Sequence, residues 1–421
     1  MSLDGLSTID FPHLRRLPLF RRILDSGAFC RRVRGIYPTQ TYPLHASLIT
    51  GTYPLRHGIY ANTLFQPGRS SPDWHWYRRF LKAPPLYDIA RRAGLTTATL
   101  LWPSAGRSAN RYVIPEIKKT RPGQSFPLLV LSGGTFPFIL HMLIRYGSLL
   151  KSLSYSHLDD LTTAVACRLI RKRKTELLLA HLLDLDGTRH RHGFRSREAE
   201  AVLADQDRRL GRLLEACRLG GGEAETAFVV FGDHAYRDVH TRIRINAAFR
   251  KAGLLDFDRR GKLACWQAWA NCCEGSAQVT LQDPEDAGLR RRVEGVFSEL
   301  RSRPEPLIET VYDRARVLEM KVGEGIHYIL EAAEGCYFVP QAEGEVVAPA
   351  EESFRAAHGY HPDHAGYSSL FLASGPGVRT GVEIEEMSIV DIGPTLAALL
   401  GLEMPGSEGR IVKEILEEEK P

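Results

Sequence analysis

Aspartate and histidine side chains recur near the ends of the most apolar segments of the sequence. They are Asp4, Asp186 and His190, Asp233 and His234, and His358. Asp186 and His190 are four residues apart, a spacing at which two side chains at the start of a helix point the same way. Three Asp and three His without clustered cysteines suit Zn²⁺ or Mn²⁺ better than an iron–sulfur cluster or a structural zinc site. The set therefore predicts a site for divalent transition metals.

Each of these residues, taken alone, has an ordinary structural interpretation. Asp233 could cap a helix, Asp4 could form a turn with Gly5, and a histidine such as His234 or His358 could be hydrogen-bonded in the core. The metal interpretation depends on the joint pattern. Open α/β sheets collect ligands at the carboxyl ends of their strands, so residues that follow different strands can converge there.

Thr41 stands at the start of a predicted helix. A helix is predicted over residues 42–50, with Pro43 in its first turn and Gly51 at its end, which places Thr41 at the N-cap. Most N-cap threonines only cap a helix. The Thr41 hydroxyl would lie at the positive end of the helix dipole, and the Asp and His residues further along the chain make a purely structural role less favoured.

Apolar strands that alternate with helices must position these residues. Strands are predicted at residues 29–37, 96–102, 177–183, 227–231 and 367–373. Helices are predicted at residues 14–23, 42–50, 85–93, 158–172, 198–219 and 392–400. The strand at 177–183 is continuously apolar, as expected for a parallel strand that is buried on both faces. The alternation predicts an α/β fold with a doubly wound, mostly parallel central sheet.

The middle of the chain departs from this alternation. Between residues 247 and 353, short candidate strands at 265–269, 278–281 and 336–339 accompany one helix near 289–301. We interpret 247–353 as an inserted α+β cap subdomain and residues 1–246 with 354–421 as the catalytic core. Residues 104–155 show no pattern that assigns elements.

The beginning of the sequence bears on the placement of Asp4 and on cellular location. Only three residues precede Asp4, whereas a strand has about 5–6 residues, so either the first strand is short or its start lies upstream of Met1. No signal peptide is present, and the seven cysteines lack metal-site spacing. We expect a cytoplasmic protein, or an exported one if a signal peptide is missing upstream.

Composition excludes some classes of protein. Hydrophobic residues make up 43% and charged residues 25%, which is ordinary for a soluble globular protein. The net charge of +5 is spread along the chain, so it does not indicate binding of a nucleic acid duplex. Residues 126–150 are apolar but interrupted by glycine, proline and charge, and a bilayer span needs about 20 apolar residues. We predict a buried loop and helix there, and no membrane span.

Several motifs, in order, resemble those of the alkaline phosphatase superfamily, and within it the type I phosphodiesterase/nucleotide pyrophosphatase family. They are Asp4-Gly, Pro38-Thr-Gln-Thr-Tyr-Pro-Leu-His45, Thr50-Gly-Thr-Tyr-Pro54, His57-Gly-Ile with Asn62, Trp102-Pro103, Asp186-x-x-x-His190-x-x-Gly193, Asp233-His234, His358-Gly-Tyr360 and Gly375-Pro376. The resemblance covers nearly the whole core. One departure is Gly232-Asp-His-Ala235, where family members usually carry Ser-Asp-His-Gly.

The resemblance implies an alkaline phosphatase-like fold and a site with two divalent metal ions, which would be zinc, with manganese as the alternative. One ion would be held by Asp4, Thr41, Asp233 and His234, and the other by Asp186, His190 and His358. Thr41 would attack phosphorus, and Asn62 would donate a hydrogen bond to a phosphoryl oxygen. The implied activity is hydrolysis of a phosphodiester or pyrophosphate bond in a small nucleotide-type substrate through a covalent phosphoryl-threonine.

Three alternatives can be compared with this reading. Sulfatases of the same fold use a Cys-x-Pro-x-Arg motif, and Thr41-Tyr-Pro-Leu-His45 has neither the cysteine nor the arginine. Phosphonate hydrolases and phosphomonoesterases of the superfamily share the metal ligands and stay open. A metal-free binding protein on the same fold is disfavoured because every expected ligand type is present. The oligomeric state is not predicted.

Overall fold

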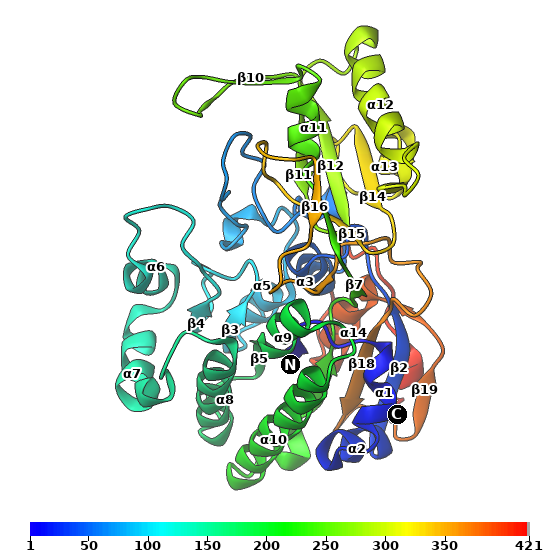
Figure 1. Ribbon diagram of the computed structural model, residues 1–421. Helices are drawn as coiled ribbons and strands as arrows, with labels where there is room; N and C mark the ends of the chain where they lie inside the picture. The colour runs from blue at the N-terminus through cyan, green and yellow to red at the C-terminus, as the bar shows by residue number, and fades with distance from the viewer. Residues whose placement is uncertain (419–421) are drawn as a thin grey trace.

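The computed structural model describes residues 1–418, and its core is a large twisted sheet with helices on both faces (Figure 1). Within the described residues this sheet has nine strands in the order β19-β2-β18-β6-β1-β5-β3-β4, with β20 also paired to β2. The strands are β1 (Ser2–Leu3), β2 (Gly27–Arg34), β3 (Thr97–Trp102), β4 (Tyr112–Pro115), β5 (Leu177–Leu182), β6 (Phe228–Phe231), β18 (Ser369–Ser374), β19 (Val382–Ile384) and β20 (Met387–Ser388).

The pairing in this sheet is mostly parallel, as predicted. Strand β1 runs parallel to both of its neighbours, β5 and β6, and β3 runs parallel to β4 and β5. Strand β18 is antiparallel to β2 and to β6. Helices packed on both faces of such a sheet define a doubly wound architecture, so the predicted fold class is confirmed.

Two hydrophobic clusters lie on opposite faces of the sheet. On one face, Phe20 of α2 and Leu203 of α10 pack with Leu182 and Val230. On the other, Leu48 of α3 packs with residues of α5 and α14. The core helices are α1 (Phe11–Leu14), α2 (Pro18–Asp25), α3 (Thr41–Thr50), α4 (Pro54–His57), α5 (Leu86–Arg92), α8 (Tyr155–Arg171), α9 (Asp184–His192), α10 (Arg197–Leu219) and α14 (Ile392–Leu399).

A second region, at the top of Figure 1, is built on the four-stranded antiparallel sheet β11-β12-β14-β13. Its strands are β11 (Ala268–Cys272), β12 (Ser276–Leu281), β13 (Ile308–Tyr312) and β14 (Tyr328–Ala332). Its helices are α11 (Ile245–Lys251), α12 (Ala287–Arg301) and α13 (Arg314–Glu319). The division of the chain at residues 247 and 353 stays a prediction.

Short strands accompany this region and join it to the core. They are β7 (Arg237–Asp238), β8 (Thr241–Ile243), β9 (Leu255–Phe257), β10 (Leu263–Trp266), β15 (Cys336–Phe338), β16 (Val347–Pro349) and β17 (Ala356–Ala357). Strand β8 precedes residue 247 yet pairs with both β15 and β16. The connection back to the core therefore runs through two small sheets, because β17 pairs with β7 immediately before His358.

Two predicted helices differ in the structure because of local chain chemistry. The helix predicted over residues 14–23 is divided into α1 and α2, and Pro18 stands in the first turn of α2, where its missing N–H is tolerated. Helix α3 begins one residue earlier than predicted. Gln40 is its N-cap and Thr41 is its first helical residue, so the prediction that Thr41 caps the helix is wrong.

The prediction of a buried loop and helix at residues 126–150 is also wrong. The structure has two helices there, α6 (Phe126–Gly133) and α7 (Phe136–Tyr146), and several of their large apolar side chains are exposed. In the part of the chain that the structure describes, no helix combines the length and the apolar character needed to cross a bilayer.

Strand β6 ends at a glycine that has no room for a side chain. A Cβ on Gly232 would lie 1.7 Å from the carbonyl oxygen of Leu6, a backbone atom in the loop that follows β1. This close approach excludes the serine that family members usually carry before the Asp-His pair. It also holds the loops after β1 and β6 against each other.

Gly232→Ala should therefore lower the free energy of unfolding by about 2 kcal/mol or more, because the backbone at Leu6 must move. Chemical denaturation, followed by circular dichroism, measures this loss. Gly295→Ala is the matched control: Gly295 lies inside α12 with no described atom within 4 Å of an added Cβ. That change should raise stability by up to ~1 kcal/mol. Equal midpoints for the parent and Gly232→Ala would contradict the packing argument.

Candidate metal centre

Three aspartates follow three neighbouring strands at the centre of the sheet. Asp4 follows β1, Asp233 follows β6, and Asp186 lies in the first turn of α9, just after β5. The sheet order is β6-β1-β5, and all three strands are parallel. Their carboxyl ends therefore open onto one edge, where a ligand site is expected in a fold of this class.

The first group of candidate ligands consists of Asp4, Asp233 and His234, and one ligand atom of each lies within 4.8 Å of the others. His234 Nε2 is 3.2 Å from Asp4 Oδ1 and 3.5 Å from Asp233 Oδ2. Thr41 Oγ1 joins this group, because it lies 3.3 Å from the same His234 nitrogen. The backbone N–H of Gly5 donates to Asp233 Oδ1 at 2.9 Å and fixes that carboxylate.

The second group consists of Asp186, His190 and His358, again with ligand atoms within 4.8 Å of one another. His190 Nε2 is 3.3 Å from Asp186 Oδ1. His190 Nδ1 is 2.8 Å from the Ala356 carbonyl, and His358 Nδ1 is 3.1 Å from the Thr39 carbonyl. A carbonyl only accepts, so both Nδ1 atoms donate, and the Nε2 atoms are left for a metal.

The two groups adjoin each other. The imidazole rings of His234 and His358, one from each group, are stacked with their centroids 3.9 Å apart. Arg189, between Asp186 and His190 on α9, is 1% exposed and reaches across to the segment after Asp4. Its guanidinium donates to the Gly5 carbonyl and pairs with Asp10 at 2.5 Å. This arginine therefore ties the loop that carries Asp4 to the helix that carries Asp186.

Burial and charge repulsion govern the first group. Burial raises the pKa of Asp4 well above its ordinary value, and the negative charges of Asp186 and Glu116 raise it further. Burial and the charge of Asp4 likewise raise the pKa of Asp233. Burial lowers the pKa of His234, with a further contribution from His358. The enclosed carboxylates thus repel one another, and a bound cation would relieve that repulsion.

The second group behaves as an ion pair. Burial alone would lower the pKa of His190, but the charges of Asp186 and Glu274 outweigh it and raise that pKa to about 10. Burial acts to raise the pKa of Asp186, and the positive charge of His190 reverses this and holds it below its ordinary range. Without a metal, a proton on His190 balances the Asp186 carboxylate.

The donor set fits divalent metal ions. Asp4 Oδ1 and Asp233 Oδ2 are buried without a hydrogen-bond partner among residues 1–418, and both face His234 Nε2. Carboxylate oxygens and imidazole nitrogens together are typical ligands of Zn²⁺ and Mn²⁺. The structure thus brings the sequence-predicted ligands together in two sets.

Asn62 is held close to the first residues of α3. Its side-chain oxygen accepts a 2.9 Å hydrogen bond from the backbone N–H of Tyr42, the residue after Thr41. An N–H can only donate, so this contact fixes which end of the amide is oxygen. The Asn62 backbone N–H donates to Gln40 Oε1 at 3.1 Å. The amide NH₂ is left as a donor in a defined place.

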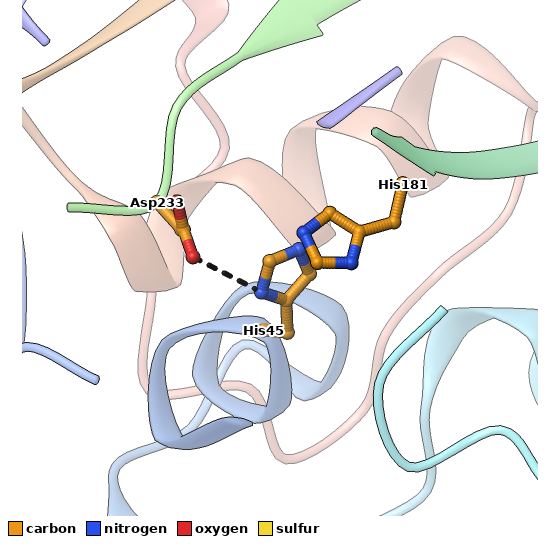
Figure 2. Close-up of side chains that lie close together, drawn as sticks. All are labelled: His45, His181 and Asp233. Atoms are coloured by element: carbon orange, nitrogen blue, oxygen red, sulfur yellow. Dashed lines mark ion pairs between the residues drawn. The ribbon is translucent and has the colours of Figure 1, made fainter. Parts of the chain in front are cut away.

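A third group, His45, His181 and Asp233, also has ligand atoms within 4.8 Å of one another (Figure 2). His45 Nδ1 donates to the Thr41 carbonyl at 2.8 Å and lies 3.5 Å from Asp233 Oδ2. Its Nε2 is 2.9 Å from the Ser2 hydroxyl, so both ring nitrogens have partners. We therefore interpret this group as support for Asp233 and for the start of α3.

Sequence reasoning missed four residues beside the two ligand groups. His45 is four residues after Thr41 on one helix, and that spacing was a usable signal. His181, which lies 3.2 Å from Asp4 Oδ2, is a lone polar residue in an apolar strand, a second usable signal. Tyr236 donates to Asp186, and Glu274 accepts from the His358 N–H at 3.1 Å. Nothing in the local sequence distinguishes these last two.

Comparisons with known proteins agree with this geometry. The family model "Type I phosphodiesterase / nucleotide pyrophosphatase" matches residues 1–370. Human ectonucleotide pyrophosphatase/phosphodiesterase family member 5 is 23% identical over 414 residues, which cover 96% of this chain and 74% of that protein. Human family member 1 is 30% identical over 135 residues, which cover 29% of this chain and only 14% of that much longer protein.

A solved structure shares the fold over almost the whole chain. It is murine family member 5 in an inactive threonine-to-alanine form, in complex with AMP. The TM-score is 0.67 at 19% sequence identity, and the match covers 99% of this chain and 98% of that one.

Metal binding should release protons. At neutral pH the metal-free protein holds a proton on His190, whose pKa is about 10, and a metal must displace it to bind the ring nitrogen. Calorimetric titration of zinc into metal-free protein, in buffers of different ionisation enthalpy, should show release of at least one proton per chain. The raised pKa values of Asp4 and Asp233 act in the same direction. A binding enthalpy that is independent of the buffer would contradict this description of the site.

Proposed function

Because the chain belongs to the type I phosphodiesterase/nucleotide pyrophosphatase family of hydrolases, we propose that it cleaves phosphodiester or pyrophosphate bonds in small nucleotide-type molecules. The reaction would use two divalent metal ions, one held by Asp4, Thr41, Asp233 and His234 and the other by Asp186, His190 and His358. The observation that carries the proposal is the position of Thr41 Oγ1, 3.3 Å from His234 Nε2 within the first ligand group.

The position of Thr41 beside the first ligand group supports its role as the nucleophile. Its hydroxyl makes no capping hydrogen bond on α3, because Gln40 is the N-cap. In the proposed reaction the Thr41 oxygen forms a bond to phosphorus while the bond to the leaving oxygen breaks on the opposite side. Water then cleaves the phosphoryl-threonine and restores the hydroxyl. The bound metals would supply the positive charge that makes the hydroxyl a better nucleophile and stabilises the phosphoryl oxygens.

Two features of the chain would bind the phosphoryl group. The Asn62 amide, whose oxygen is engaged by the Tyr42 N–H, keeps its NH₂ free to donate to a phosphoryl oxygen. The N-terminus of α3, a helix of ten residues, adds the positive end of its dipole beside Thr41. Both act on charge that is spread over phosphoryl oxygens, so they favour phosphoryl transfer over other hydrolysis.

The surroundings of Thr41 support a nucleotide-type substrate. The ring of Tyr42 packs edge-on against Trp74 with centroids 5.3 Å apart, and the Lys118 ammonium lies 3.3 Å from the centre of the Trp74 ring. Tyr42 is buried and supports Trp74, and the half-buried Trp74 and the exposed Lys118 are suited to a base and a phosphate, respectively. The AMP complex of the murine relative is consistent with this substrate class.

A panel of chromogenic substrates tests the reaction type on the zinc-loaded protein. Bis-p-nitrophenyl phosphate and the p-nitrophenyl ester of thymidine monophosphate should be cleaved with higher kcat/KM than p-nitrophenyl phosphate or p-nitrophenyl phenylphosphonate. Preference for the monoester or the phosphonate would instead support one of the two alternative hydrolase activities. Zinc binding without turnover of any of the four would support a binding protein on this fold.

Substitution of Thr41 tests the nucleophile. Thr41→Ala should lower kcat by about 10²-fold or more while the protein still binds zinc, whereas Thr41→Ser should keep much of the activity. The melting temperature should change little, because Thr41 is not the N-cap. Thr50→Ala, at the other end of α3, is the matched control and should keep full turnover.

The stereochemical course gives an independent readout of the same step. Two successive in-line displacements produce net retention at phosphorus, and a single attack by water produces inversion. We expect retention for a chiral phosphodiester cleaved by the parent protein. Inversion, or an active Thr41→Ala variant, would remove Thr41 from the role of nucleophile.

A further inference from the structure

The α6–α7 hairpin, together with the residues that connect it to Tyr155 at the start of α8, has large apolar side chains that no other part of the described structure covers. In Figure 1 its two helices lie at the left edge of the molecule, away from the central strands. Leu128 of α6 is 66% exposed, and Ile144 of α7 is 79% exposed. The other large exposed side chains of this segment are Phe136, Leu140, Leu143, Leu153 and Tyr155.

Helix α7 is apolar on two opposite faces. Phe138, Ile139 and Met142 are buried and pack against the core, where Leu161 and Val165 of α8 belong to the same cluster. The residues at helical spacing on the other side, Phe136, Leu140, Leu143 and Ile144, face outward. A helix with large apolar side chains on opposite faces is normally enclosed on both, in a large core or in lipid. Here one face is enclosed by protein and the other is not.

The charges around this surface have one sign. Residues 117–158 contain no Asp or Glu, although about one residue in eight of the whole chain is acidic. The same 42 residues carry Lys118, Lys119, Arg121, Arg145 and Lys151. Of these, Arg121 is paired with Asp73, Arg145 lies over the Tyr146 ring, and neither Arg145 nor Lys151 has an ion-pair partner in residues 1–418. Exposed apolar helices with unneutralised basic residues are typical of segments that lie in the headgroup region of anionic membranes.

The hairpin is held against the rest of the fold by specific contacts, so its exposed face has a defined orientation. The Thr135 hydroxyl accepts from the Val113 N–H at 3.2 Å, and the Thr135 N–H donates to the Val113 carbonyl at 3.1 Å. The ring of Phe138 contacts the ring of Tyr112 with centroids 4.9 Å apart. The exposed face is therefore presented by helices whose opposite side is anchored to β4 and α8.

We propose that the α6–α7 hairpin binds the surface of an anionic lipid bilayer, with its outer apolar side chains among the headgroups and Arg145 and Lys151 beside the lipid phosphates. The hairpin would lie in the interface, consistent with the finding that no described helix is suited to span a bilayer. This inference goes beyond the proposed hydrolysis and does not depend on it. A lipid surface fits better than an acidic protein because the uncovered face is broadly apolar as well as basic.

The docked surface would lie close to the metal-ligand edge. Tyr155, the first residue of α8, follows the hairpin in the chain and packs on Gly187, where an added Cβ would lie 2.2 Å from the tyrosine ring. Gly187 is the residue after Asp186 on α9. Membrane binding would therefore fix the orientation of the candidate metal site relative to the bilayer surface.

Vesicle flotation with the full chain tests the proposal. The parent protein should float with vesicles of phosphatidylserine and phosphatidylcholine, bind phosphatidylcholine vesicles more weakly, and be released by raised salt. The double variant Leu128→Ser, Ile144→Ser should lower the affinity for vesicles at least about tenfold. Two apolar side chains that are exposed in the free protein would no longer be buried in the bilayer interface. Leu219→Ser is the matched control, since Leu219 is 53% exposed at the end of α10, and it should bind as the parent does.

A second double variant tests the basic residues, and two further measurements test whether the variants fold as the parent does. Arg145→Gln with Lys151→Gln should lower affinity for the anionic vesicles and leave binding to phosphatidylcholine unchanged. Circular dichroism and melting temperature should be those of the parent for all variants, because each changed side chain is exposed. Turnover of a soluble substrate should also be unchanged.

Three results would overturn the proposal. The first is a parent protein that does not bind anionic vesicles, and the second is binding that the Leu128 and Ile144 changes do not weaken. The third is a concentration-dependent dimer in sedimentation velocity that Ile144→Ser abolishes, together with no vesicle binding, which would identify a second copy of the chain as the cover.

Discussion

Electrostatic repulsion among Asp4, Asp186 and Asp233 is the constraint on which the rest of the molecule depends. The carboxylates stand at the ends of β1, β5 and β6, three adjacent parallel strands, and the fold encloses them together. Burial and mutual charge raise the pKa of Asp4 and of Asp233. Such an arrangement is costly without compensating cations, so the centre of the sheet is a place where stability is given up and metal binding restores it.

The surrounding residues keep these carboxylates and their histidines in place. Backbone carbonyls accept from Nδ1 of His190 and of His358, which directs both Nε2 atoms towards the centre. Buried Arg189 joins the segment after Asp4 to α9. These contacts come from segments far apart in the chain, and they pre-organise a site whose geometry does not depend on a flexible loop.

Thr41 and the α6–α7 hairpin are both attached to this centre. His45 connects the Thr41 carbonyl to Ser2 of β1, so the first turn of α3 is tied to the strand that carries Asp4. On the other side, Tyr155 packs on Gly187 beside Asp186. The proposed nucleophile and the helix that follows the proposed docking surface thus both contact the ligand-bearing elements. This is a structural reason to expect that the reaction and the proposed membrane contact take place on one side of the protein.

The sequence by itself determined the alternation of strands and helices, the mostly parallel sheet and the residue types of the ligand set, because periodicity and strand-end polarity are local properties. It also singled out Thr41, but misplaced it as an N-cap, since one residue at a helix end depends on hydrogen bonds that sequence patterns do not resolve. Only the tertiary structure decided that β6, β1 and β5 are neighbours, that His181 faces Asp4, and that several large apolar side chains of residues 126–150 are exposed. Strand order and burial depend on which distant segments pack together. The local sequence of an apolar segment does not determine whether another part of the protein covers it.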